Sequence, residues 1–135
     1  MSVAICLRVR SASPELLAAV LGALAQHNAA IYRRNPLLGA PWSLVWIPDQ
    51  IESCDAKGCR LNDTSTLVDV IALYKQGYGS CGPLACAYAG YLQGRHNDVA
   101  ARVRLLPSQI DRDIWHAVAE NSNRVYDPQQ LGGAS

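Results

Sequence analysis

The residue with the most distinctive surroundings in this sequence is Cys81. It follows the glycine-containing stretch 77–80 and precedes the uncharged stretch 84–92, whose composition is typical of a helix that is buried on all sides. Cys81 is therefore expected in the first turn of that helix, where unpaired backbone N–H groups and the helix dipole favour a thiolate over a thiol. The same N–H groups can stabilise the oxyanion that forms when a thiolate attacks a carbonyl. The sequence therefore predicts that Cys81 is a nucleophile.

A thiolate nucleophile needs a base, and His116 is the best candidate among the three histidines. It stands in the apolar stretch 114–118, which predicts a strand, whereas His27 and His96 are expected at a helix end and in a loop. An isolated histidine in a strand is more often a structural residue than a catalytic one. Asp127 in the next predicted strand strengthens the case, because a carboxylate opposite an imidazole can orient it.

The turn between these two strands decides whether His116 and Asp127 share a face of the hairpin. If residues 121–122 form a two-residue turn, His116 lies directly opposite Asp127, with Cβ atoms about 4.5 to 5.5 Å apart. A four-residue loop shifts the partner by two positions and keeps the same face. A three-residue loop without a bulge would place Asp127 on the wrong face and separate the pair.

Three motifs together carry a resemblance to a known superfamily. They are Gly-Ser-Cys-Gly-Pro at 79–83, Trp-His-Ala-Val at 115–118 and Val-Tyr-Asp-Pro at 125–128. In this order they resemble the papain-like cysteine hydrolases in their transglutaminase-like branch. They are also similar to the bacteriocin-processing cysteine peptidases, which share a Cys-Gly-Pro helix start and an Asp-Pro after the histidine strand. The resemblance covers residues 76–131.

The resemblance implies a role for each residue of the candidate site. Cys81 would be the nucleophile, His116 the general base and then the general acid, and Asp127 the residue that orients the imidazole. Gln76 is the nearest match to the family's oxyanion-hole glutamine and would act beside the Cys81 amide, although it lies one residue closer to the cysteine than in the papain pattern. The short interval from Cys81 to His116 suits the transglutaminase-like branch better than papain. No cofactor and no metal are implied.

The activity expected from these residues is thiol-dependent acyl transfer on peptide or isopeptide amides, through a thioester intermediate. Water as the acceptor gives a cysteine peptidase or isopeptidase, whereas a substrate amine gives transamidation with the same catalytic residues. Hydrolysis is preferred because water is always available and no acceptor-amine site is recognisable. The alternatives are a transglutaminase-like transamidase or small-molecule acyltransferase, and a non-catalytic structural or assembly protein that keeps the fold.

Size and charge limit the other classes of function. The chain has 135 residues with 12 Lys+Arg against 11 Asp+Glu, a formal net charge of +1. This length predicts one domain over residues 1–135 whose core needs neither disulfides nor a structural metal. The near-zero charge argues against nucleic acid or an anionic membrane surface as partner. A peptide or protein substrate is what the resemblance implies.

The number of cysteines and one apolar run indicate the cellular compartment in which the protein is expected. Five cysteines cannot all pair within one chain, so a reducing, cytoplasmic setting is expected, with secretion or delivery into another cell as the alternative. The apolar run 16–25 has the outline of a secretory signal but is too short to span a bilayer. Glu15 directly before this run favours an ordinary core helix.

The remaining cysteines have other expected roles. Cys54 and Cys59 bracket a turn-forming stretch and would lie near each other as loop thiols or a local disulfide. A zinc site there lacks a second ligand pair with suitable spacing. Cys6 and Cys86 are expected to pack as small hydrophobic residues.

Hydrophobic periodicity predicts the elements that position the candidate site. They are a strand over 3–10, a helix over 14–28, a short buried strand over 42–47, a helix that begins at 63–65 and includes Tyr74, a helix from Cys81 to Gly94, and strands over 99–106, 114–120 and 124–127. Helices followed by antiparallel strands indicate the α+β class. The resemblance further implies a papain-like or transglutaminase-like core, in which helices pack on a C-terminal antiparallel sheet that carries His116 and Asp127. Residues 132–135 are expected to be frayed.

Overall fold

The computed structural model describes residues 4–10, 14–47, 51–55, 58–61, 64–107 and 115–132, without the side chains of 8–10, 51–65, 107 and 115. The helices are α1 (Pro14–Arg34), α2 (Val70–Gln76), α3 (Cys81–His96), α4 (Pro128–Leu131) and the 3-10 helix η1 (Pro41–Ser43). The strands are β1 (Cys6–Arg10), β2 (Val45–Trp46), β3 (Ile51–Asp55), β4 (Gly58–Leu61), β5 (Thr64–Val68), β6 (Tyr78–Gly79), β7 (Arg102–Pro107), β8 (Trp115–Glu120) and β9 (Val125–Tyr126).

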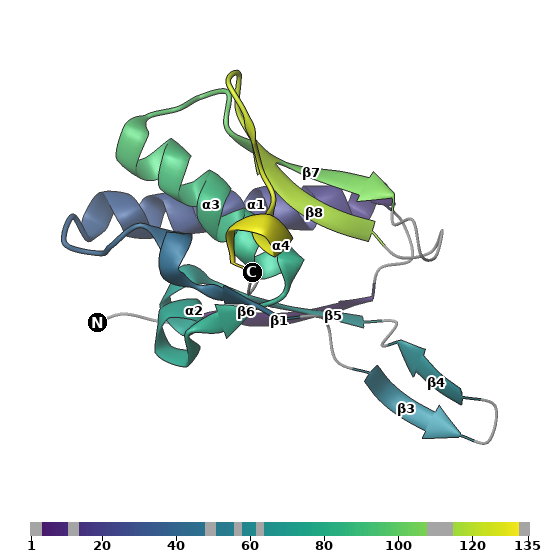
Figure 1. Cartoon of the computed structure of the whole chain (residues 1–135). Coiled ribbons are helices and arrows are strands. Elements are labelled where there is room, and N and C mark those ends of the chain that lie inside the picture. Colours follow the sequence, from purple (N-terminus) through teal and green to yellow (C-terminus); the bar gives the residue numbers. More distant parts are fainter. Residues whose placement is uncertain are drawn as a thin grey trace.

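Helices α1 and α3 cross at the centre of the fold (Figure 1). They approach closely where α3 has no side chain, since a Cβ atom at Gly90 would lie only 2.5 Å from the Cβ of Asn28. A Cβ atom at Gly94 would collide with the carbonyl oxygen of Ala29. Residues 83–90 of α3 are all buried, which confirms the expectation of a helix that is covered on all sides.

Small sheets cover this helix pair on two sides. The antiparallel sheet β7-β8-β9 lies on one side, where α3 packs against β8 and α1 against β7. Figure 1 shows α2, β1, β5 and β6 on the other side, with β1 and β5 antiparallel and β6 parallel to β2. Helices and mainly antiparallel strands in separate layers confirm the predicted α+β class.

Helix α1 is longer than predicted, since it continues past Asn28 to Arg34. Its last two turns carry the buried residues Ala29, Ile31 and Tyr32, of which Ile31 and Tyr32 belong to the main core. The prediction stopped at Asn28 because an asparagine often marks a helix end, but burial of the following apolar residues extends the helix.

The helix predicted from residues 63–65 is wrong in its first part. Thr64–Val68 forms strand β5, which pairs with β1, and the helix begins only at Val70. Asp69 is the N-cap residue, and its Oδ1 accepts a hydrogen bond from the backbone N–H of Ala72 at 3.1 Å. Helix α2 ends at Gly77, whose φ of 85° is a left-handed conformation that suits glycine.

Three other boundaries differ from the predictions. Residues 42–47 form η1 followed by the two-residue strand β2 in place of one buried strand. Helix α3 passes Gly94 and ends at His96, which was expected in a loop, with Asn97 as a left-handed cap at φ 52°. Strand β7 begins at Arg102 rather than at Val99, whose side chain is fully exposed.

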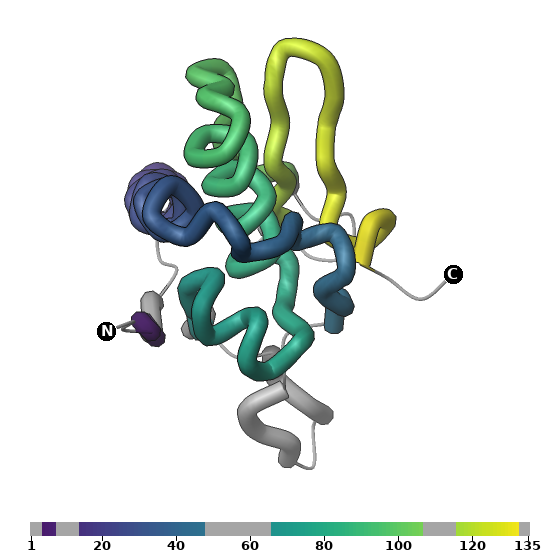
Figure 2. Tube along the Cα trace, turned by 90° about the vertical axis from the view of Figure 1, so that its left-hand side faces the viewer, coloured from purple at the N-terminus to yellow at the C-terminus, as the bar shows by residue number. Residues whose placement is uncertain are grey.

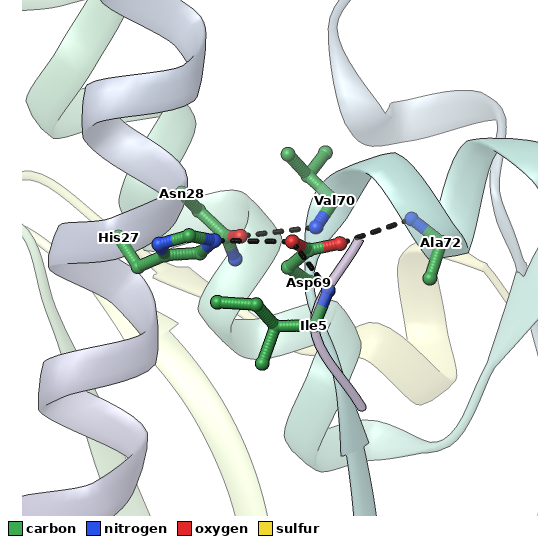
Figure 3. Close-up of polar contacts among 6 residues, drawn as sticks. All are labelled: Ile5, His27, Asn28, Asp69, Val70 and Ala72. Atoms are coloured by element: carbon green, nitrogen blue, oxygen red, sulfur yellow. Dashed lines mark hydrogen bonds and ion pairs between the residues drawn. The ribbon is translucent and has the colours of Figure 1, made fainter. Parts of the chain in front are cut away.

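Asp69 also connects α2 to two other segments. Figure 3 shows its carboxylate between α1, β1 and the start of α2. Oδ2 accepts hydrogen bonds from the backbone N–H of Ile5 at 2.9 Å and from Nε2 of His27 at 3.0 Å. His27 thus lies in the interior of α1, not at a helix end as expected, and its ring binds a carboxylate that is fully buried.

Asn28 supplies a second buried link between α1 and α2. Its Oδ1 accepts a hydrogen bond from the backbone N–H of Val70 at 3.0 Å (Figure 3). This bond and the Asp69 cap together satisfy N–H groups of the first turn of α2. The position of α2, which leads directly to β6 and α3, is therefore fixed by polar side chains as well as by the core.

Candidate active site

Cys81 is the first residue of α3, as the sequence predicts. The strand before it, β6, is held in place by β2, because the N–H groups of Val45 and Ile47 donate to the carbonyls of Gly77 and Gly79 at 3.1 and 2.9 Å. Ser80 is the N-cap residue, and within the described part of the chain its side chain makes no capping hydrogen bond. The N–H groups of the first turn are therefore open to a ligand oxygen.

The Cys81 thiol is free and half-buried. Its side chain packs against the smaller core cluster, which includes Leu21, Leu67 and Ala117. Ala117 directly follows His116 in β8, so the packing of α3 on this strand brings the start of α3 to the histidine.

His116 and Asp127 form the contact that the hairpin predicts. His116 Nε2 and Asp127 Oδ1 lie 2.7 Å apart, and each side chain is 24% exposed. The same carboxylate oxygen accepts the backbone N–H of Gln129 at 3.0 Å, because Asp127 is the N-cap residue of α4. The short helix α4 therefore holds the carboxylate toward the imidazole.

A four-residue loop connects the two strands of the hairpin, in place of the two-residue turn. Glu120 pairs with Val125, which leaves residues 121–124 in the loop. Asp127 is thus shifted from the position directly opposite His116 but keeps the same face, as expected for this loop length. The returning strand is shorter than the predicted 124–127, because the chain leaves β9 after Tyr126 and turns into α4.

Cys81 and Asp127 act on His116 from two sides. A hydrogen bond with Cys81 is the largest influence that raises the pKa of His116 from 6.5 to about 9. Partial burial opposes this rise, whereas the hydrogen bond and negative charge of Asp127 support it. Because Asp127 binds Nε2, Nδ1 is the ring nitrogen left for the sulfur. Asp127 thus contacts His116 directly, and Cys81 lies near enough to act on the pKa of the same imidazole.

Gln76 is placed less favourably. It is the exposed last residue of α2, and its side-chain amide donates a hydrogen bond to the carbonyl of Tyr78 at 2.6 Å. This bond would have to break before the amide could donate to an oxyanion. The backbone N–H of Cys81 remains the better candidate donor, and a role of Gln76 in the oxyanion hole stays a prediction.

The other cysteines have separate environments. Cys86 is fully buried, its thiol points to the carbonyl of Leu21 at 3.3 Å, and burial raises its pKa, as expected for a packing residue. Cys6 is exposed, so its expected role in packing is wrong. Cys54 and Cys59 are paired in the register of β3 and β4, but the expectations for their side chains lie outside the described residues.

An aromatic cluster next to Asp127 was not anticipated from the sequence. Tyr88 is fully buried on α3, and burial and the nearby charge of Asp127 raise its pKa to about 12. Its ring centroid lies 5.0 Å from that of Trp42, and the Trp42 ring lies 5.4 Å from Tyr126. The signal that could have shown the cluster is the spacing of Tyr88 and Tyr91, which places both on one face of a helix.

Comparison with protein-family models, curated proteins and solved structures finds no match for this chain. None of the helices in the described ranges is sufficiently long and apolar to cross a membrane. Within the same ranges, His, Cys, Asp and Glu side chains form no group of three or more that could hold a metal ion.

Proposed function

We propose that the protein is a thiol-dependent amide hydrolase, a cysteine peptidase or isopeptidase with a papain-like or transglutaminase-like core. The observation that carries this proposal is the position of His116, whose Nε2 lies 2.7 Å from Asp127 and whose pKa is raised by the thiol of Cys81. An imidazole between a thiol and a carboxylate is the arrangement that nucleophilic catalysis by cysteine requires. The position of Cys81 at the start of a buried helix adds backbone N–H donors for an oxyanion.

In the first half of the reaction, Cys81 takes the acyl group from the substrate amide. The thiolate of Cys81 attacks the amide carbonyl carbon, and the carbonyl oxygen becomes an oxyanion near the backbone N–H of the same residue. The C–N bond then breaks as protonated His116 donates its proton to the leaving nitrogen, which releases an amine and leaves a thioester.

In the second half, water regenerates the enzyme. Neutral His116 takes a proton from water, and the hydroxide attacks the thioester carbon. The C–S bond breaks, the carboxylic acid leaves, and Cys81 returns as a thiolate beside protonated His116. Asp127 keeps its hydrogen bond to Nε2 throughout and stabilises the imidazolium. A substrate amine in place of water would give transamidation by the same steps.

The function can be tested by trapping the thioester. We expect intact mass spectrometry to show one acyl group per protein after incubation with N-acetylglycine 4-nitrophenyl ester at pH 7, and hydroxylamine to remove it. Peptide mapping should place the acyl group on Cys81, and Cys81→Ser should remove that signal. Cys6→Ser is the matched control, because Cys6 is an exposed free thiol remote in sequence from the site.

A second variant separates an enzyme from an incidentally reactive cysteine. His116→Ala should slow acylation of Cys81 by about 100-fold, because general acid–base catalysis typically contributes this much or more. Acylation of Cys81 at the same rate in wild type and His116→Ala, or acylation confined to Cys6, would contradict the proposed function and favour a non-catalytic protein.

A further inference from the structure

A cavity of about 550 Å³ opens between the second half of α3, the β8–β9 hairpin and η1. Figure 2 shows this part of α3 in green beside the hairpin in yellow, with the blue segment that leads from α1 to β2 crossing between them and α2. The cavity is lined by the aromatic residues Trp42, Tyr91 and Tyr126 and by the polar residues His96, Asp98 and Arg124. None of these residues takes part in the proposed chemistry.

Three contacting aromatic rings form one wall of the cavity, which is partly open to solvent. The rings of Trp42 and Tyr126 are nearly parallel, with an interplanar angle of 14°, and Tyr91 meets Trp42 edge-on at 5.6 Å. Trp42 is 37% exposed. The exposed part of these rings offers an aromatic contact for another planar group.

The cavity carries the basic side chain of Arg124 and the acidic side chain of Asp98. The Arg124 guanidinium lies 4.4 Å above the Tyr126 ring and pairs with no carboxylate of the described residues. The two oxygens of Asp98 accept hydrogen bonds from the N–H of Ala100 at 3.1 Å and from the Asn121 amide at 2.9 Å. Arg124 has no such partner among the described residues, so its N–H donors are available to a carboxylate.

We propose that this cavity is a substrate subsite for a peptide segment that carries an aromatic side chain next to an acidic residue. The aromatic side chain packs against the exposed part of the Trp42 and Tyr126 rings, and the carboxylate binds Arg124. This inference rests on the proposed function, which makes a peptide the substrate. It goes further by naming the side chains that the substrate presents.

The position of the cavity sets its distance from the bond that is cleaved. Tyr91 and Cys81 lie on the same helix, separated by about 15 Å at 1.5 Å per residue. An extended peptide advances about 3.3 Å per residue, so this distance corresponds to four or five residues. The hairpin also connects the cavity to the candidate catalytic site, because Tyr126 of the cavity directly precedes Asp127 in the sequence. The aromatic–acidic pair is therefore expected four or five residues from the scissile amide.

Binding can be measured without catalysis in the Cys81→Ala variant. The probe is N-acetyl-Tyr-Glu-amide, and the signal is the indole N–H resonance of Trp42 in a ¹H–¹⁵N NMR titration, assigned with Trp42→Phe. We expect a saturable shift with Tyr-Glu and binding about tenfold weaker with N-acetyl-Tyr-Gln-amide, because a charged hydrogen bond is lost. Arg124→Gln should lower the affinity for Tyr-Glu to the level of Tyr-Gln.

Arg102→Gln is the matched control, because Arg102 lies on β7 of the same sheet but pairs with Glu120 outside the cavity. It should leave the affinity unchanged. Equal affinity for Tyr-Glu and Tyr-Gln, no shift of the Trp42 signal, or equal losses in Arg124→Gln and Arg102→Gln would overturn the subsite. Because the titration uses an inert variant, its failure is independent of whether wild-type Cys81 forms a thioester.

Discussion

At the scale of single residues, His116 is the group whose protonation controls the proposed reaction. Its pKa is raised to about 9, first by the hydrogen bond with Cys81 and then by Asp127, so it is protonated at neutral pH. The imidazolium can therefore donate a proton to the leaving amine without first taking one from the thiol. The first half of the reaction can therefore proceed at any pH at which His116 is protonated.

This gives a pH prediction with a definite sign. The rate of amide cleavage should fall as pH rises through about 9, because His116 then loses the proton that the leaving nitrogen needs. The measurement is kcat/KM against pH for any amide substrate that the enzyme cleaves. A rate that stays constant or rises through pH 10 would show that another group supplies the proton.

Asp127 combines two tasks that substitutions can separate. Asp127→Asn should keep the cap of α4, because asparagine is as good an N-cap residue as aspartate, but it removes the negative charge beside His116. Asp127→Ala removes the cap as well and should cost about 1 kcal/mol of unfolding free energy. We therefore expect both variants to acylate Cys81 more slowly, while urea unfolding shows a larger loss in Asp127→Ala than in Asp127→Asn, which loses only the charge beside His116. Wild-type acylation rates in both variants would exclude Asp127 from the site.

At the scale of the elements, the contact between α1 and α3 fixes the start of α3 where Cys81 lies. Gly90→Ala should destabilise the fold by about 1 to 3 kcal/mol, because the added methyl group would meet Asn28 and the Ala25 carbonyl. Gly22→Ala on α1 is the matched control, since nothing lies within 4 Å of its Cβ position. It should stabilise the fold by about 0.5 to 1 kcal/mol. Equal effects of the two substitutions on thermal or urea unfolding would contradict this account of the crossing.

The elements also show where local sequence was informative. The start of α3 was predicted correctly because Gly-Ser-Cys-Gly-Pro before an uncharged stretch is a local signal. The β5–α2 boundary was not, because Leu67, Val70 and Ile71 fit helical spacing while residues 64–68 also pair with β1, a partner distant in sequence. The buried interaction of His27 with Asp69 likewise joins segments far apart in the chain, so no local pattern revealed it.

At the scale of the whole molecule, the candidate site combines the start of α3 with the β8–β9 hairpin. The sequence predicted only part of the way in which these two segments come together. The hairpin rule gave the shared face of His116 and Asp127, and the observed four-residue loop keeps it. The final placement comes from α4, which was not predicted, because Asp127 caps that helix after leaving β9. The aromatic cavity brings together η1, α3 and the hairpin, and only the assembled fold shows it.

The stability of the whole molecule should depend on pH through the same histidine. His116 has an ordinary pKa of 6.5 when unfolded and about 9 when folded, so the folded state binds the proton more tightly. Its contribution to stability is complete below about pH 6.5 and is lost as pH rises through about 9. We expect the unfolding free energy from urea titrations to decline over this interval, and to decline less in His116→Gln. Parallel pH profiles of the two proteins would contradict the raised pKa.

The most direct test of the account is the reactivity of Cys81 toward iodoacetamide at pH 6, followed by peptide mass mapping. Free cysteine has a pKa near 8.5 and is less than about 1% ionised at this pH. The exposed Cys6 is the internal comparison in the same protein. If Cys81 and His116 form a thiolate–imidazolium pair, Cys81 should be alkylated at least about tenfold faster than Cys6, although it is half-buried, and His116→Ala should abolish the difference. Alkylation of Cys81 no faster than Cys6, and unchanged in His116→Ala, would contradict a catalytic cysteine.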